Sequence, residues 1–316
     1  MEMKFFNTEE TRAALPFSKL IPALKTMFQQ ECTVPRRHIH EVRASDNPLT
    51  TLIMPAWSEA GYMGIKTVNI APQNSRNNLP GLFSTYLLYD VVTGQPIAQM
   101  DGNEITSRRT AAASALGASF LARPDARRLT VLGTGRVGRL IPHAYQAVLP
   151  IEEVKVWNIR PESAIQMVQA LNQAGIEASV ANDLEQAVRW ADVVSCATLS
   201  TTPLVKGDWL QPGSHLDLIG SFAPGMRESD TKAIIQASLF IDTQEAMEKS
   251  GDLLAPIVSQ QLKNEDVIGT LADLCRNQCR ARASDEERTV FKAVGTALED
   301  LAAASLVYRD FGKESK

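Results

Sequence analysis

The pattern of apolar and polar positions changes character along the chain. Ser18 to Gln30 places its apolar residues on one helical face, which predicts an amphipathic helix. Short apolar runs separated by turn residues then predict strands at 51–54, 62–70, 82–89 and 96–100. The alanine-rich segment from Glu104 to Leu121 predicts a long helix.

From Arg127 onward, apolar strands alternate with helical segments. The predicted strands are 129–132, 153–157, 177–180, 192–196, 214–218 and 238–241. This alternation is typical of a doubly wound, mostly parallel sheet. Asp285 to Phe311 has helical spacing throughout and predicts one long final helix, which would return the chain to the first domain.

We therefore expect an α/β protein in which a Rossmann doubly wound parallel sheet is inserted in a smaller α+β domain. The smaller domain, residues 1–120 plus 287–316, would contribute to substrate binding. Residues 121–286 would form the dinucleotide-binding domain. Substrate is expected in the cleft between the two domains, near the carboxyl ends of the parallel strands.

A glycine motif follows the first predicted Rossmann strand. Gly133, Gly135 and Gly138 have G-x-G-x-x-G spacing between an apolar run and a helical pattern. The first glycine would permit a tight turn, the second a close approach of pyrophosphate, and the third close packing of helix on strand. The predicted phosphate-binding residues are Gly133, Thr134, Gly135, Arg136, Val137 and Gly138. The alternative is an ordinary tight turn.

The end of the second Rossmann strand bears on the choice of cofactor. NAD-binding folds have an acidic residue there that binds the adenosine ribose, whereas this chain has Asn158, Arg160 and Ser163. No carboxylate would repel a 2'-phosphate, and a guanidinium is available to pair with it. The sequence favours NADPH over NADH, and the alternative for Arg160 is a solvated loop cation.

Composition and charge exclude several classes of protein. The formal net charge is -4, with 22% charged and 44% hydrophobic residues, as in ordinary soluble globular proteins, and no basic run suggests nucleic acid. Neither a signal peptide nor a membrane-spanning segment is visible, so we expect a cytoplasmic protein. Cys275 and Cys279 share a helix face but lack further zinc ligands nearby, so no metal is expected.

Three basic residues of the first domain lie in apolar or tightly structured surroundings. Lys66 lies within a predicted strand, Arg109 within the alanine-rich helix, and Arg37 just before the first strands. Charged groups in such places need anionic partners. They could form internal salt bridges or a solvated face. They could instead bind a substrate carboxylate, with an arginine donating to both oxygens.

The chain resembles the ornithine cyclodeaminase/mu-crystallin family over nearly its whole length. The resemblance rests on blocks that occur in the same order, namely Leu52–Ala56, Gly64–Asn69, Asp101–Thr106, Arg109–Ala112, the glycine motif, Phe291–Gly295 and Glu299-Asp300. It implies a homodimer built through the first domain.

The resemblance also implies roles for particular residues. Arg37, Lys66 and Arg109 would bind the substrate carboxylate, and Thr85 would line the same pocket. Two further segments would pass beneath the nicotinamide and its ribose, Ala197-Thr198-Leu199 and Gly220-Ser221.

One departure from the family pattern indicates the reaction. The cyclodeaminases have an aspartate two residues before a Pro-Gly pair, and this chain has Phe222 there, which cannot accept a proton or hold an ammonium. Glu228 and Asp230 are expected on the helix that follows. The segment around Phe222 resembles the branch that reduces pyrroline- and piperideine-2-carboxylates.

The hypothesis is an NADPH-dependent ketimine reductase that converts 1-pyrroline-2-carboxylate to L-proline, and by extension 1-piperideine-2-carboxylate to L-pipecolate. Phe222 would form an apolar wall for the substrate ring, and Lys66 would be the catalytic proton donor, or would only hold the carboxylate. The alternatives are ornithine cyclodeamination, an alanine-type dehydrogenase, and a non-catalytic NADPH-dependent binder of the mu-crystallin kind.

Overall fold

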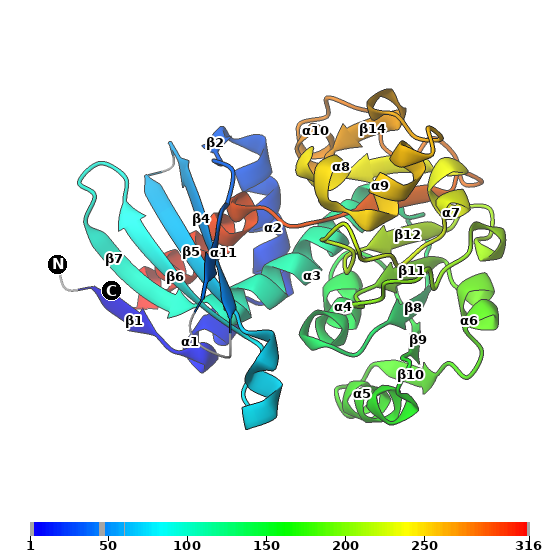
Figure 1. Ribbon diagram of the computed structural model, residues 1–316, viewed down its shortest axis with the longest axis horizontal. Helices are drawn as coiled ribbons and strands as arrows, with labels where there is room; N and C mark the ends of the chain where they lie inside the picture. Colours follow the sequence, from blue (N-terminus) through cyan, green and yellow to red (C-terminus); the bar gives the residue numbers. More distant parts are fainter. Residues whose placement is uncertain (1–2, 44–47, 60, 315–316) are drawn as a thin grey trace. The chain divides into compact units, whose positions relative to one another are not determined.

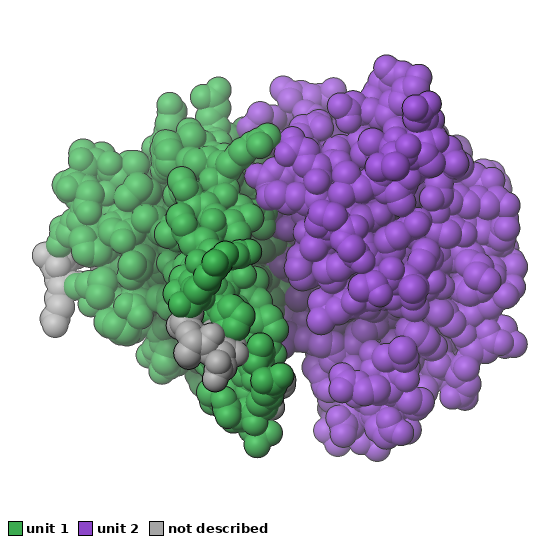
Figure 2. Space-filling model, viewed as in Figure 1, with its two compact units in different colours: residues 1–109, 296–316 green, residues 110–295 purple. Residues whose placement is uncertain are grey.

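The chain folds into two units in a computed structural model that describes residues 3–43, 48–59 and 61–314 (Figures 1 and 2). Unit 1 comprises residues 1–109 and 296–316, and unit 2 comprises residues 110–295. The sequence-based boundaries lay at 120/121 and 286/287. They differ because helix α3 (Gly102–Leu121) contributes to both units and because a strand missed in the sequence belongs to unit 2.

Unit 1 is built on a seven-stranded sheet with the order β1-β7-β6-β5-β4-β2, in which β3 also pairs with β4. Only the β1–β7 pair is parallel among the pairs described. The strands are β1 (Lys4–Phe6), β2 (Cys32–Thr33), β3 (His38–Val42), β4 (Leu49–Ser58), β5 (Tyr62–Ile70), β6 (Leu82–Asp90) and β7 (Pro96–Asp101). The helical segments are α1 (Thr8–Ala13), α2 (Phe17–Gln29), the 3-10 helix η1 (Pro72–Asn77), the start of α3, and α11 (Ala297–Glu314).

One face of this sheet is buried against helix α11, which packs on β4, β5, β6 and α2. Antiparallel pairing places Met54, Lys66, Tyr86 and Met100 in one row across four strands, and each is at most 5% exposed. Because strand residues alternate between faces, the next row belongs to the other face. The register therefore places a lysine in the middle of an otherwise apolar buried face.

Unit 2 contains an eight-stranded sheet in which every described pair is parallel. Its order is β10-β9-β8-β11-β12-β15-β13-β14. The strands are β8 (Arg128–Leu132), β9 (Glu153–Trp157), β10 (Glu177–Val180), β11 (Val193–Cys196), β12 (His215–Leu218), β13 (Ser238–Ile241), β14 (Val267–Thr270) and β15 (Thr289–Lys292). The central strands are buried on both faces, as helices on both sides of a parallel sheet require.

Helices connect these strands and cover the sheet (Figure 1). They are α4 (Arg136–Gln146), α5 (Pro161–Gln173), α6 (Leu184–Trp190), α7 (Thr231–Ile235), α8 (Glu245–Lys249), α9 (Gly251–Val258) and α10 (Leu271–Cys275), with the 3-10 helices η2 (Gly207–Trp209) and η3 (Asn264–Asp266). The doubly wound parallel sheet and its six predicted strands are confirmed.

The prediction of one long helix from Asp285 to Phe311 was wrong. Residues 289–292 form strand β15 between β12 and β13, and the helix begins only at Ala297. All four strand residues are buried, including the polar Thr289 and Lys292, and a short buried run cannot be assigned to strand or helix by periodicity. Gly295 carried the missed signal, because its φ of 79° separates the strand from the helix.

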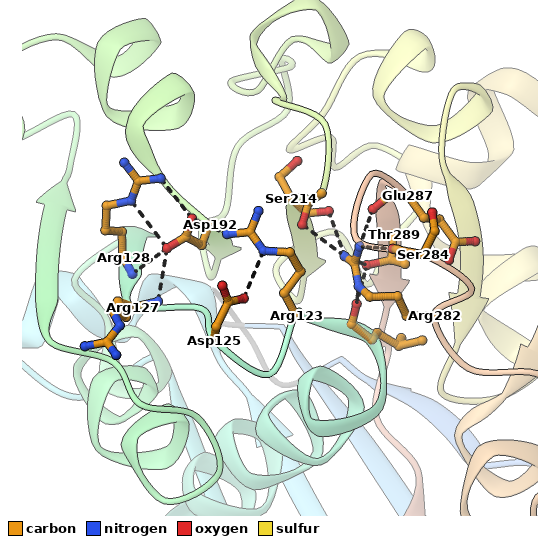
Figure 3. A network of polar contacts seen from close by, with 12 residues as sticks. Arg123, Asp125, Arg127, Arg128, Asp192, Ser214, Arg282, Ser284, Glu287 and Thr289 are labelled. Atoms are coloured by element: carbon orange, nitrogen blue, oxygen red, sulfur yellow. Dashed lines mark hydrogen bonds and ion pairs between the residues drawn. The ribbon is translucent and has the colours of Figure 1, made fainter.

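A polar network joins the amino ends of the Rossmann strands (Figure 3). The Asp192 carboxylate, just before β11, accepts the backbone N–H groups of Arg127 and Arg128 at 3.0 Å each. Farther along, the Arg282 guanidinium donates to the Leu121 carbonyl at 2.7 Å and to the Thr289 hydroxyl at 3.3 Å. Ligands of such sheets bind at the opposite, carboxyl edge, so this network is structural.

Within the residues that the structure describes, no helix is both long enough and apolar enough to cross a membrane.

Candidate active site

The three motif glycines occupy the turn between β8 and α4, and each has the geometry its predicted role requires. Gly133 has a φ of 99°, and a side chain there would collide with the carbonyl oxygen of Ala197. A side chain at Gly138 would collide with the carbonyl oxygen of Gly133, so the helix must approach the strand closely. Gly135 is the N-cap of α4, and a Cβ there would meet no atom within 4 Å. The turn thus leaves open space at a helix N-terminus, which fits a pyrophosphate.

The remaining predicted phosphate-binding residues lie in the same turn or at the start of α4. Arg136 begins the helix and is exposed, and Val137 and Thr134 are half-buried.

The residues that would choose between NADPH and NADH follow β9. The Asn158 side-chain amide donates to the Arg160 carbonyl at 3.1 Å, which shapes the loop, and Ser163 lies in the first turn of α5. Arg160 is the N-cap residue of α5 and its side chain is exposed. The loop therefore presents a guanidinium and an amide, and no carboxylate, directly after the strand.

Two loops at the carboxyl ends of β11 and β12 contain the segments expected beneath the nicotinamide. Ala197 directly follows β11 and donates its backbone N–H to the Leu132 carbonyl at 2.8 Å. Leu199 is 76% exposed. In the next loop, the Ser221 hydroxyl donates to the Met226 carbonyl at 2.6 Å, and the Phe222 ring follows with 50% exposure. An apolar ring left half in solvent at this edge is available to contact a ligand.

In unit 1, Lys66 and Arg109 belong to one buried ionic cluster. The Lys66 Nζ atom lies 2.5 Å from Asp300 Oδ2, and it also donates to the Thr106 hydroxyl at 3.2 Å. Arg109 donates through Nε to Asp300 Oδ1 at 2.8 Å and through Nη1 to Glu299 Oε2 at 2.6 Å. Internal ion pairs, one of the alternatives weighed from the sequence, are therefore present.

Arg37 directly precedes β3, whose first residue is His38. Its charge also acts on Lys66, whose pKa it lowers.

The pKa of the Lys66 amine is lowered toward neutral pH. Burial lowers the pKa of Lys66 to about 8; Asp300 opposes this shift, whereas Arg109 and Arg37 add to it. Desolvation is the largest cause of this shift, and the two arginines contribute less. Burial by itself raises the pKa of Asp300, but the two cations outweigh it and hold that pKa below its ordinary value.

The structure does not bring Thr85 to this group. Thr85 pairs with Thr67, one residue on from the Lys66–Tyr86 pair, so its side chain lies on the opposite face of the sheet and is exposed. The sequence contained no signal of the register that decides this. Thr106, one turn before Arg109, occupies the polar position beside Lys66 instead.

The sequence also indicated no role for three buried acids. Glu299 and Asp300 form the anionic half of the cluster, and adjacent acids in an otherwise apolar helix were the available signal. Glu228 was expected on a helix, but it precedes α7, whose N-cap is Asp230. The Glu228 carboxylate is fully buried and accepts hydrogen bonds from the loop after β11 and from the loop after β12.

A Rossmann unit with a glycine turn at a helix N-terminus, inserted in a smaller unit that buries an ionic cluster, defines a class of protein, the two-unit nicotinamide-dependent oxidoreductases. More specifically, the chain belongs to the ornithine cyclodeaminase/mu-crystallin family, whose model matches residues 1–315. The resemblance identified from the sequence is confirmed.

Known relatives cover almost the entire chain. A delta(1)-pyrroline-2-carboxylate reductase of Paracoccus denitrificans is 39% identical, covering 97% of this chain and 96% of its own. The delta(1)-pyrroline-2-carboxylate reductase of Thermococcus litoralis, solved with NADH and L-proline, has a TM-score of 0.93 at 28% identity over 99% of this chain and 98% of its own. An archaeal alanine dehydrogenase dimer with bound NAD has a TM-score of 0.91 at 30% identity, over 100% of this chain and 98% of its own.

Proposed function

We propose that the protein is an oxidoreductase that reduces the C=N bond of cyclic imino acids with NADPH. It converts 1-pyrroline-2-carboxylate to L-proline and, as a second substrate of the same kind, 1-piperideine-2-carboxylate to L-pipecolate. The observation that carries the proposal is Lys66, a buried amine with a pKa of about 8 beside Arg109 and Arg37. Support comes from the pyrroline-2-carboxylate reductase of Paracoccus denitrificans and from the Thermococcus litoralis enzyme solved with NADH and L-proline.

The cations of the buried ionic cluster suit the substrate's carboxylate. The ion pairs with Glu299 and Asp300 use Nη1 and Nε of Arg109 and so orient its guanidinium plane. The remaining nitrogen, Nη2, can donate to an added carboxylate, and the nearby Arg37 charge, which already acts on Lys66, also favours an anion there. Because the guanidinium is already fixed, little rotational freedom is lost on binding, and the imine carbon is held in one position.

The Lys66 ammonium suits the other requirement of the reaction. Reduction of an imine adds a hydride to carbon and a proton to nitrogen, and a protonated imine accepts hydride more readily. Bound NADPH supplies the hydride. An amine with a pKa of about 8 is protonated at neutral pH and gives up its proton more easily than an ordinary lysine. Lys66 would therefore donate the proton to the imine nitrogen.

Phe222 opposes the deaminating alternative. Ornithine cyclodeamination needs a group that handles an ammonium at this loop, and a half-exposed phenyl ring offers only an apolar surface. The ring instead suits the methylene groups of a cyclic imine. Glu228, close in sequence, cannot substitute because both its oxygens accept hydrogen bonds from the protein.

A direct assay tests the function. The purified protein is mixed with NADPH and either the five- or the six-membered cyclic imine, and loss of absorbance at the nicotinamide band is followed, with NADH in parallel. Imine-dependent oxidation with formation of proline or pipecolate is expected. Binding of NADPH without oxidation would indicate a non-catalytic binder, and release of ammonia from ornithine would indicate a cyclodeaminase.

A second candidate activity is alanine dehydrogenation, favoured by the likeness to the archaeal alanine dehydrogenase. Pyruvate, ammonia and a reduced nicotinamide would then replace the cyclic imine. Turnover of this mixture at a rate above that of the cyclic imines would make alanine dehydrogenation the main activity.

The preference for NADPH rests on the loop after β9, where Asn158 stands in place of an acid and Arg160 is exposed. We expect Asn158→Asp to weaken NADPH binding by about 10- to 100-fold, because the new carboxylate repels the 2'-phosphate, while NADH binding is kept or improved. Titration of nicotinamide fluorescence measures both constants. Arg189→Ala is the control, since it removes an arginine that pairs with Glu185 within α6, and equal loss in both variants would contradict the assignment.

We also propose a homodimer formed through unit 1. The sheet face opposite Lys66 bears Trp57 and Phe83, which are 37% and 46% exposed, with Ile53, Ile65 and Leu87 half-buried around them. Such an apolar face is typical of an interface. Sedimentation velocity should give a dimer that Phe83→Lys dissociates; a monomeric wild-type protein would contradict the proposal.

A further inference from the structure

A buried carboxylate connects the two loops expected beneath the nicotinamide. Glu228 Oε1 accepts the backbone N–H of Thr198 at 2.7 Å and its hydroxyl at 2.8 Å. Its other oxygen, Oε2, accepts the backbone N–H of Gly220 at 2.6 Å. One side chain thus bonds the loop after β11 to the loop after β12, and it has no exposed surface.

The two loops approach each other closely at Gly220. Gly220 lies so close to Thr198 that a side chain there would collide with the Thr198 carbonyl and with the Glu228 carboxylate. Gly133, the first glycine of the phosphate motif, also lies close to this loop, at Ala197. The glycine turn, the Thr198 loop and the Gly220 loop therefore form one stack of backbone segments, and Glu228 bonds two of its layers.

Glu228 is itself held in place from helix α9. Its backbone N–H and that of Ser229 both donate to Asp252 Oδ1 at 2.9 Å, at the start of α9. Lys292, at the end of β15, donates to the Leu218 carbonyl at 3.0 Å and lies 4.0 Å from Asp252 Oδ2. A buried acid with two anchored neighbours is a costly arrangement, which a merely structural turn does not need.

We propose that Glu228 is a positioning residue for the cofactor: by bonding Thr198 and Gly220 it sets the separation of the two loops that receive the nicotinamide and its ribose. The proposal rests on the nicotinamide-binding part of the proposed function, and it does not depend on which substrate is reduced. A fixed separation pre-organises the site, so that cofactor binding does not have to order the loops.

The pH dependence of cofactor binding distinguishes a positioning role of Glu228 from a purely structural one. Burial raises the pKa of Glu228 to about 7; Lys292 opposes this shift and Asp252 adds to it, and the Cys196 thiol on β11 also lies within electrostatic range. The carboxylate accepts all three bonds, whereas the protonated acid has a hydrogen facing one donor. Cofactor affinity should therefore fall as the pH falls through about 7.

The test compares Glu228→Gln with Asp192→Asn in the full-length protein. Asp192 is a matched control, because it is a buried carboxylate that accepts two backbone N–H groups at the opposite edge of the same sheet (Figure 3). We expect E228Q to weaken NADPH binding by about 10- to 100-fold and to lose the pH dependence, since its amide cannot accept from both loops. D192N should lower the melting temperature but bind NADPH as the wild type does.

Each result of this comparison either supports or overturns the proposed role of Glu228. Wild-type affinity in E228Q, or equal weakening in both variants, would overturn the proposal. Should E228Q fail to fold, Glu228→Asp keeps the charge but is one methylene too short to reach both loops, and it must then weaken binding. A wild-type protein that binds NADPH but reduces no imine would refute the proposed function while leaving this comparison intact.

Discussion

Replacing Lys66 with methionine should lower turnover of the cyclic imine by about 10²- to 10⁴-fold while leaving NADPH binding unchanged. The range is that of a positioned general acid, and methionine keeps the length of the side chain but carries no proton. Steady-state kinetics with the imine and fluorescence titration with NADPH measure the two effects separately. Normal turnover would remove Lys66 from the mechanism.

The same substitution also leaves Asp300 with one cation fewer in a fully buried place. Loss of one partner of a buried ion pair destabilises a protein by about 3–5 kcal/mol, so K66M alone could lose activity through unfolding. The double variant Lys66→Met with Asp300→Asn removes both charges and keeps an oxygen for Arg109. It should be more stable than K66M and equally inactive.

The pH dependence of the wild-type enzyme follows from the same residue. The proton donor is the ammonium, which exists below the pKa of about 8 and is lost above it. The value of kcat/KM for the imine should therefore fall as the pH rises through about 8. In the double variant this limb of the profile should be absent, and its persistence would assign the titration to another group.

Arg109→Met should lower the free energy of unfolding by about 3–5 kcal/mol. It removes bonds of 2.6 Å to Glu299 and 2.8 Å to Asp300, and both carboxylates are buried. The KM for the imino acid should also rise by about 10- to 100-fold, because the donor to the substrate carboxylate is gone. Urea denaturation and steady-state kinetics measure the two effects.

Arg108→Met is the matched control on the same helix. Arg108 pairs with Glu104 at 3.0 Å and donates to the Leu15 carbonyl at 3.0 Å. Glu104 keeps a second partner in Arg12, so removal of Arg108 should cost only about 1–3 kcal/mol. Arg109→Lys separates the two roles of Arg109, since a lysine keeps the charge but cannot donate in a fork. A KM unchanged in both Arg109 variants would exclude Arg109 from substrate binding.

Several features of the site were predictable because their signal is local. The glycine spacing follows a strand and opens a helix, and the three glycines take the geometries that the motif requires. Asn158 and Arg160 were placed after β9 for the same reason. Thr85 and the segment 289–292 were misassigned because strand register and two-sided burial are set by partners far away in sequence.

By itself, the sequence determined the family, the doubly wound sheet, the glycine turn, and the basic residues that need anionic partners. These features depend on residues that are close together in the sequence, and the sterics and solvation of those residues determine their local structure. Only the tertiary structure decided what those residues contact. Arg109 meets Asp300 across 191 positions, and Glu228 bonds Thr198 across 30. Such pairings are settled when strands and helices pack, because a buried charge must find its partner wherever the fold brings one.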